Sequence, residues 1–207
     1  LDSTDEGGLR LSTTNVRSME IDGAGLLGRG YTSVEVDGVQ HDLPDGPLWI
    51  GPEDGKTAQV HGPYNQVYRR PFCYVYDADG TEFHEYASYL VSAWSLIGNG
   101  HACAVPLAAL NDRIRAERNL IWVGVDQDAV EGYDGPFTWG DAVGVDGDAW
   151  DGAMMFVYPS GERLNAVLTA SPGSERLLFD SSPWSSRAGL PDYRIWGSQG
   201  TLRTGMF

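Results

Sequence analysis

The sequence contains almost no lysine: Lys56 is the sole lysine among 14 Lys and Arg residues, whereas Asp and Glu number 29. The formal net charge is therefore −15 at pH 7. Carboxylates repel one another unless salt screens them, so such a surface suits concentrated salt. The composition predicts a halophilic source or, because a high-GC genome also favours Arg over Lys, a high-GC host. Phosphate backbones would be repelled, and we expect no nucleic-acid partner.

Long hydrophobic runs are also missing. No apolar stretch approaches the roughly 20 residues that a transmembrane helix needs, so we expect no membrane insertion. The first ten residues have neither a basic segment nor an apolar core, and they predict no signal peptide. Apolar residues still make up 42% of the 207 positions, which is enough to build the core of one domain.

Cysteine is limited to Cys73 and Cys103, which excludes a disulfide-dense scaffold. Both lie in apolar, strand-like segments, where a free cysteine behaves as a small hydrophobic residue. We therefore favour two buried free thiols. The alternative is a bridge that would close a loop of about 30 residues and stabilise the fold by roughly 3 kcal/mol.

Catalytic motifs are absent for serine hydrolases, for nucleotide-binding loops and for zinc proteases. One enzymatic hypothesis uses Cys103 as a nucleophile. A helix expected from Pro106 would lower the pKa of its thiol, and His101 lies two residues away, on the same face of a strand. A cysteine hydrolase is thus one possible function, although buried structural cysteines are commoner.

Basic residues are missing from the whole segment between Asn119 and Glu162, which contains many carboxylates. Asp146, Asp148 and Asp151 fall in one short loop, and their oxygens could bind Ca²⁺ or Mg²⁺. The EF-hand pattern is absent, so a solvated acidic loop is the simpler interpretation and no cofactor is required. Acidic pairs such as Glu82 with Glu85 also leave a glycosidase open.

Short β-rich runs broken by turn residues dominate the chain from Tyr31 onward. Asp37-Gly38 predicts a tight hairpin between Tyr31–Val36 and Val39–Leu43, and Pro159-Ser160-Gly161 predicts another. We expect a mainly β fold, an antiparallel β-sandwich of jelly-roll type. Two short helices are expected around residues 84–97 and 106–118, because apolar residues recur there at spacings of three and four. The stripe of the first helix comprises Tyr86, Tyr89, Leu90, Ala93, Trp94 and Ile97.

Polar segments flank the expected domain at residues 20–196. Residues 1–19 read as an extended N-terminal arm and residues 197–207 as a C-terminal arm, because neither has enough apolar residues to fold alone. Their apolar residues would dock on a neighbouring molecule. These expected interface residues are Leu9, Leu11, Met206 and Phe207.

Together, the arms, the β-rich core and the missing catalytic set predict a structural subunit of an ordered assembly. A virion protein (capsid, vertex or tail) of a virus that infects a halophilic or high-GC host is the leading hypothesis, with a location in the virion or outside the cell. Its partners would be copies of itself and other structural proteins. The alternative is a secreted β-sandwich that binds or hydrolyses carbohydrate, because seven Trp and ten Tyr could stack on sugars.

Overall fold

The computed structural model describes residues 2–3, 8–13, 16, 19–51, 63–98, 100–180 and 191–205. Strands account for 40% of the structure and helices for 26%, which confirms a mainly β protein with few helices. The chain divides into two compact units, Leu1–Thr57 and Ala58–Met206. This division differs from the expected single domain over residues 20–196 flanked by arms.

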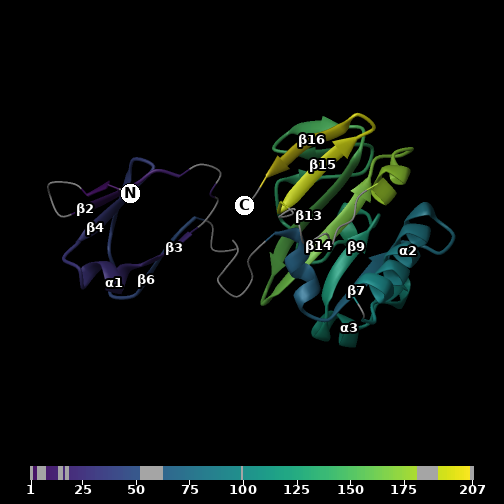
Figure 1. Cartoon of the computed structure of the whole chain (residues 1–207), viewed down its shortest axis with the longest axis horizontal. Coiled ribbons are helices and arrows are strands. Elements are labelled where there is room, and N and C mark those ends of the chain that lie inside the picture. The colour runs from purple at the N-terminus through teal and green to yellow at the C-terminus, as the bar shows by residue number, and fades with distance from the viewer. Residues whose placement is uncertain are drawn as a thin grey trace. The chain divides into compact units, whose positions relative to one another are not determined.

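The N-terminal unit consists of short strands and one small helix (Figure 1). Its elements are β1 (Asp2–Ser3), β2 (Gly8–Leu11), β3 (Met19–Asp22), α1 (Gly23–Leu27), β4 (Ser33–Val36), β5 (Val39–Asp42) and β6 (Pro47–Ile50). One sheet has the order β1-β2-β4-β5, with β2 parallel to β4, and β3 pairs with β6. Leu9, Val34, Val36 and Leu43 form the buried core. Part of the expected N-terminal arm is therefore a strand with a core residue.

The β4–β5 hairpin has the tight turn that its sequence predicts. Val36 pairs with Val39, and the two residues between them, Asp37 and Gly38, have φ values of 49° and 87°. Positive φ at both positions is the requirement of a type I′ turn. The Asp37 carboxylate also accepts a hydrogen bond from the Thr13 backbone N–H at 2.7 Å. A hydrogen bond from the Thr13 hydroxyl and, to a smaller degree, this backbone bond lower the pKa of the Asp37 carboxyl.

The larger unit is built on a seven-stranded sheet with the order β16-β15-β13-β14-β9-β7-β8 among the described residues. Its strands are β7 (Phe72–Tyr76), β8 (Cys103–Pro106), β9 (Asn119–Val123), β13 (Ala153–Ser160), β14 (Arg163–Ala170), β15 (Tyr193–Gly197) and β16 (Gly200–Gly205). The sheet is mixed: β8, β7, β9 and β14 run parallel, whereas β14, β13, β15 and β16 alternate in direction. The antiparallel jelly-roll sandwich is therefore not confirmed.

Helix α2 (Glu82–Ile97) connects β7 to β8 and confirms the helix expected around residues 84–97. It begins after Thr81, whose hydroxyl accepts a hydrogen bond from the His84 N–H at 3.1 Å. It ends where the Gly98 N–H donates to the Trp94 carbonyl. This crossover explains the parallel pairing of β7 and β8, because parallel neighbours need a long connection.

The helix expected over residues 106–118 is wrong in its extent. Strand β8 continues to Pro106, a single 3₁₀ turn η2 covers Leu107–Ala109, and helix α3 contains only Asp112–Glu117. The Asn111 side chain accepts a hydrogen bond from the Ile114 N–H at 3.1 Å and so starts a new helix at that point.

Both faces of the large sheet are covered. Helix α2 and the 3₁₀ segments η1 (Tyr64–Arg69) and η4 (Glu175–Asp180) pack on one face, as Figure 1 shows for α2. The segment with η3 (Gln127–Ala129), β10 (Phe137–Thr138), β11 (Val143–Val145) and β12 (Asp148–Trp150) covers the other. There the Phe137 ring stacks on the Phe156 ring with 4.3 Å between the ring centroids, and the Tyr158 hydroxyl donates a hydrogen bond to the Glu131 carbonyl.

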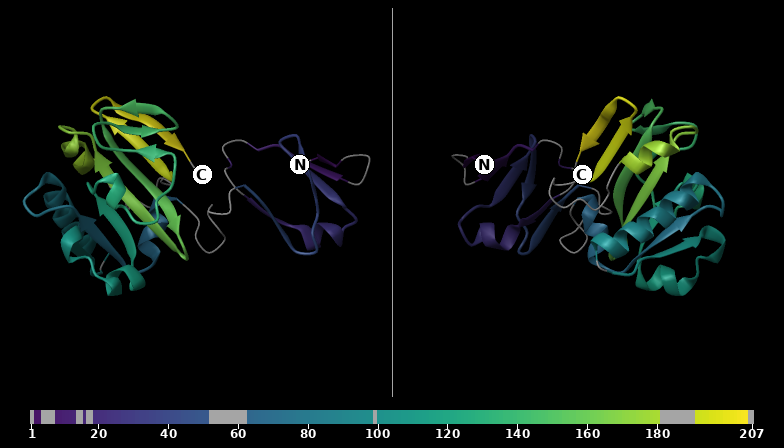
Figure 2. Two further views of the ribbon diagram at one scale, coloured as in Figure 1. Left: turned by 180° about the vertical axis from the view of Figure 1, so that it is seen from behind. Right: turned by 45° about the vertical axis from the view of Figure 1, so that its right-hand side comes forward.

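The β13–β14 hairpin is confirmed, although its strands continue through Pro159 and Ser160, so that Gly161 and Glu162 form the turn. The expected C-terminal arm is a strand over Gly200–Gly205, at one margin of the sheet (yellow in Figure 2). In the described residues, no helix has the length and apolarity to span a bilayer.

Candidate assembly interface

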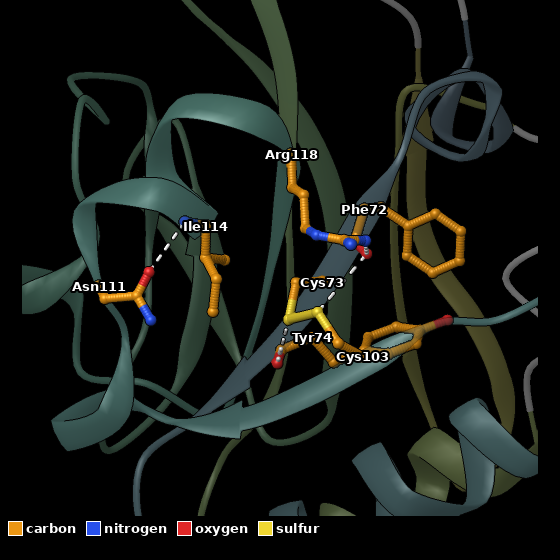
Figure 3. Close-up of a disulfide and its surroundings, with 7 residues drawn as sticks. All are labelled: Phe72, Cys73, Tyr74, Cys103, Asn111, Ile114 and Arg118. Atoms are coloured by element: carbon orange, nitrogen blue, oxygen red, sulfur yellow. Dashed lines mark hydrogen bonds between the residues drawn. A yellow bond between two sulfur atoms is a disulfide. The ribbon is translucent and has the colours of Figure 1, made fainter.

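Cys73 and Cys103 form a disulfide between the adjacent parallel strands β7 and β8 (Figure 3). The interpretation as two free thiols is therefore wrong. Strand register explains the bond, because Cys73 and Cys103 are direct Cα partners only 4.8 Å apart. The sulfurs also lie 3.6 Å and 3.8 Å from the Tyr74 and Phe72 carbonyls, and these are contacts, since a disulfide sulfur has no hydrogen to donate.

The bridge changes the case for a cysteine nucleophile. A thiolate is the reactive form of cysteine, and in the disulfide Cys103 has none. The expected helix dipole is also absent at this point, because α3 begins at Asp112 and not at Pro106. His101 is exposed and precedes β8. The structure supplies no further support for a cysteine hydrolase.

The acidic loop lies around strand β12. Asp146 is in the turn before β12 with a φ of 54°, and Asp151 follows the strand. Asp148 lies 3.5 Å from the Arg203 guanidinium, so its carboxylate already has a cationic partner. Within the described ranges, no three His, Cys, Asp or Glu side chains gather in a metal-binding group. A Ca²⁺ or Mg²⁺ site at these aspartates stays a prediction.

The expected interface residues of the N-terminal arm lie inside their own unit. Leu9 is 4% exposed, and both Leu9 and Leu11 line an apolar cavity of about 350 Å³ between β2, β3, β4 and α1. Met206 and Phe207 lie outside the described residues. Most aromatic side chains are in cores, and Tyr89 is the only exposed large aromatic in the described part of the chain. A sugar-stacking platform therefore gains no support.

A different surface combines exposed apolar side chains with an absence of charge. Leu96 is 85% exposed and Ile97 66%, and both lie at the end of α2. Tyr89, two turns earlier, is 45% exposed. From Tyr86 to Asn111 the sequence contains no Asp, Glu, Lys or Arg at all. In a chain with a net charge of −15, this segment itself adds nothing to the repulsion between two copies.

The same uncharged segment contains the edge strand of the large sheet. Strand β8 pairs with β7 on one side and is the last strand in the sheet order of the described residues. An edge strand presents unpaired backbone groups to any chain that can align with them. Helix α2 packs against β8, and residues 98–102 connect the two. We call residues 89–97 together with β8 the uncharged edge surface.

The sequence contained a signal for this surface, namely the uninterrupted run without charge. The helical spacing predicted that Tyr89 and Ile97 lie on a buried stripe. Periodicity identifies the apolar face of a helix, but it does not show over what length other elements cover that face. In the structure, Tyr86, Ala87 and Leu90 are buried, whereas Ile97 at the end of α2 is 66% exposed.

Comparisons with models of protein families, with curated proteins and with solved structures find no match for this chain.

Proposed function

We propose that the chain is a structural subunit of an extracellular assembly, with a virion as the leading case, and that copies associate through the uncharged edge surface. The observation that carries the proposal is the exposure of Leu96 and Ile97 in a segment free of charge. Apolar patches on acidic proteins are typical of contact sites, because the rest of the surface resists approach.

The disulfide supports an extracellular location. Disulfides persist in secreted proteins and on particle surfaces, whereas the cytosol of most organisms keeps thiols reduced. The Cys73–Cys103 bond joins β8 to β7 covalently and so fixes the edge strand in the sheet. A β-rich fold of this size is also common among virion proteins, which is an argument by analogy of fold. The acidic composition favours a halophilic or high-GC host.

The energetics of the surface are adequate for a weak contact that repeats in a lattice. Burying one Leu or Ile side chain contributes about 1.5–3 kcal/mol. Because 1.4 kcal/mol changes a dissociation constant tenfold, loss of either residue should weaken association at least about tenfold. A shell or fibre repeats such a contact many times, so modest pairwise affinity is sufficient.

Light scattering after size exclusion tests the proposal. In molar KCl, where charge repulsion is screened, the molar mass measured by light scattering should rise with protein concentration as copies associate. The double variant L96D/I97D should stay monomeric under the same conditions, with an unchanged circular dichroism spectrum.

The matched control is V39D. Val39 is 59% exposed on β5 of the N-terminal unit, so this variant also replaces an exposed apolar side chain by a carboxylate. It should associate like the native chain. If the native protein is monomeric at every salt and protein concentration, or if both variants lose association equally, the proposed interface is wrong.

A further inference from the structure

Arginine side chains gather at one end of the seven-stranded sheet, where the parallel strands β7, β9 and β14 begin. Arg70 lies two residues before β7, Arg118 immediately precedes β9, and Arg163 is the first residue of β14. Because the three strands are parallel neighbours, their starts lie at the same end of the sheet. We call Arg69, Arg70, Arg118 and Arg163 the arginine end.

Hydrogen bonds to backbone carbonyls hold these guanidinium groups in one region. The Arg70 guanidinium donates to the Glu162 carbonyl at 2.9 Å, one residue before Arg163. The Arg163 guanidinium in turn donates to two carbonyls in the last turn of α3. Arg118, which follows α3, donates to the Phe72 carbonyl at 3.3 Å, as Figure 3 shows. The contacts therefore link the starts of all three strands.

The positive charge of the arginine end is not neutralised by the part of the chain that the structure describes. None of its four side chains forms an ion pair with a described carboxylate, whereas the acidic residues of α3 pair with arginines of the same helix. Glu162 is adjacent in sequence, but four guanidinium groups outnumber its single charge. A guanidinium group has five N–H donors, so donors remain for a further oxyanion.

The opposite end of the same sheet is acidic. Asp77 follows β7, Asp126 lies three residues after β9, and Asp151 lies two residues before β13, whose first residue pairs with the last residue of β14. All three aspartates are exposed, and none has an ion pair among the described residues. We call them the aspartate end. At about 3.3 Å per residue, the eight residues of β14 separate the two ends by roughly 25 Å.

Salt decides which charges two copies experience. At about 0.1 M salt, charges are screened beyond about 10 Å, so the two ends of one molecule do not neutralise each other. The net charge of −15 is screened in the same way between distant parts of two copies. Carboxylates and guanidinium groups a few ångströms apart across a contact still attract. At about 1 M salt the screening length falls to roughly 3 Å, and this attraction weakens as well.

We propose that the arginine end of one copy binds the aspartate end of a second copy, head to tail. Guanidinium groups bind carboxylates through paired, parallel hydrogen bonds, which matches the chemistry of the two ends. A head-to-tail contact uses two different surfaces, so each copy keeps one end for the next copy and the contact extends into a row or a ring. This contact is additional to the uncharged edge surface and does not depend on it.

The test uses the full-length protein with the uncharged edge surface disabled. The last turn of α2 lies near the start of β7, since the Trp94 and Phe72 ring centroids are 5.0 Å apart. The background variant is therefore L96S/I97S, because serine removes apolar surface without adding charge near the arginine end. In about 0.1 M KCl its molar mass, measured by light scattering, should rise with protein concentration, and in about 1 M KCl this rise should disappear.

Neutralising the arginine end should weaken association in this background. The change R69Q/R70Q should raise the dissociation constant about two- to thirtyfold, because two exposed ion pairs are lost. The matched control is R10Q/R29Q in the N-terminal unit, which changes the net charge by the same amount. It should associate like the background variant.

Neutralising the aspartate end distinguishes a specific contact from overall repulsion. The change D77N/D126N lowers the net negative charge, so it would strengthen association if overall repulsion alone mattered. The proposed contact predicts the opposite, a loss as large as that of R69Q/R70Q. Stronger association of D77N/D126N than of the background variant overturns the proposal.

A mixture of the two variants identifies the surfaces as partners. Each variant retains the end that the other has lost. At a concentration where neither associates alone, the equimolar mixture should form dimers with one copy of each and no larger species. A mixture that stays monomeric overturns the proposal.

The two proposed contacts fail in different ways. If L96S/I97S is monomeric in about 0.1 M KCl while the native chain associates in molar KCl, the head-to-tail contact is wrong and the uncharged edge surface stands. If L96S/I97S associates in about 0.1 M KCl while the native chain is monomeric in molar KCl, the head-to-tail contact stands and the uncharged edge surface is wrong.

Discussion

The two edges of the seven-stranded sheet differ in how they are protected. Strand β16 carries Arg203, which pairs with Asp148 at 3.5 Å, and its neighbour Arg194 lies over the Trp196 ring at 5.2 Å. Strand β8 at the opposite margin has no charged residue and is bound to β7 by the disulfide. Figure 2 shows the yellow β16 at one margin and the blue and teal strands at the other.

This difference has a physical meaning. Charged side chains on an edge strand prevent other chains from aligning with it, and β16 has that protection. Within strand β8 only Pro106 at its end limits pairing, and helix α2 packs against the strand. One edge thus carries charge that opposes pairing, and the other is the edge that we propose for association.

The largest effect should come from removing the bond that fixes β8. The variant C73A/C103A should lose about 2–4 kcal/mol of unfolding free energy, since the crosslink restricts the unfolded chain. Association should also weaken, because β8 is then held by backbone hydrogen bonds alone. Chemical denaturation and light scattering measure the two effects.

Reductant provides the control for this variant. It should destabilise the native protein by a similar amount and leave C73A/C103A unchanged. Equal stability of the native protein with and without reductant would mean that the bridge does not contribute to the fold.

Local patterns in the sequence were sufficient for features formed by neighbours along the chain. The Asp37-Gly38 turn and helix α2 each depend on a few adjacent residues, namely a pair that tolerates positive φ and a Thr81 cap followed by an apolar stripe. The prediction of the second helix was wrong in its start, because the Asn111 side chain caps a helix that begins at Asp112. The spacing of apolar residues alone did not distinguish this start from Pro106.

Contacts between distant segments could not be obtained in this way. The parallel pairing of β9 with β14 and of β2 with β4 joins strands that are separated by other elements. The disulfide follows from such a register, so it was equally inaccessible. The exposed residues of the proposed interface depend on which part of α2 is covered, which is a property of the folded unit.

Salt should have an intermediate effect. Lowering KCl from molar to millimolar concentration should reduce the melting temperature by several degrees, because 29 acidic residues then repel one another with little screening. A loss of 1 kcal/mol corresponds to about 2–4 °C for a chain of this size. Association through β8 should weaken in parallel. Thermal scans measure the first effect and light scattering the second.

Sodium chloride separates screening from specific binding of K⁺. The two salts should act alike at equal ionic strength if repulsion is the cause. Equal or greater stability at low salt would contradict a halophilic adaptation of this surface.

The smallest effect on stability should come from discharging the protected edge. In R203T/D148N the pair between β16 and β12 is removed, and its partners are 44% and 63% exposed. Exposed pairs contribute little because solvent screens them, so the unfolding free energy should hardly change. Association should nevertheless increase, because β16 loses the charge that keeps other chains away.

The combination with L96D/I97D decides between the edges. If charge is what separates them, the fourfold variant should associate through β16 while β8 is blocked, and its oligomers should differ in size from those of the native protein. A control with the charges exchanged, R203D/D148R, keeps both signs at the edge and should behave like L96D/I97D when combined with it. If R203T/D148N does not increase association, either alone or combined with L96D/I97D, charge does not explain the contrast between the two edges. The shape and apolar surface at the end of α2 would then be the property that directs the proposed assembly to β8.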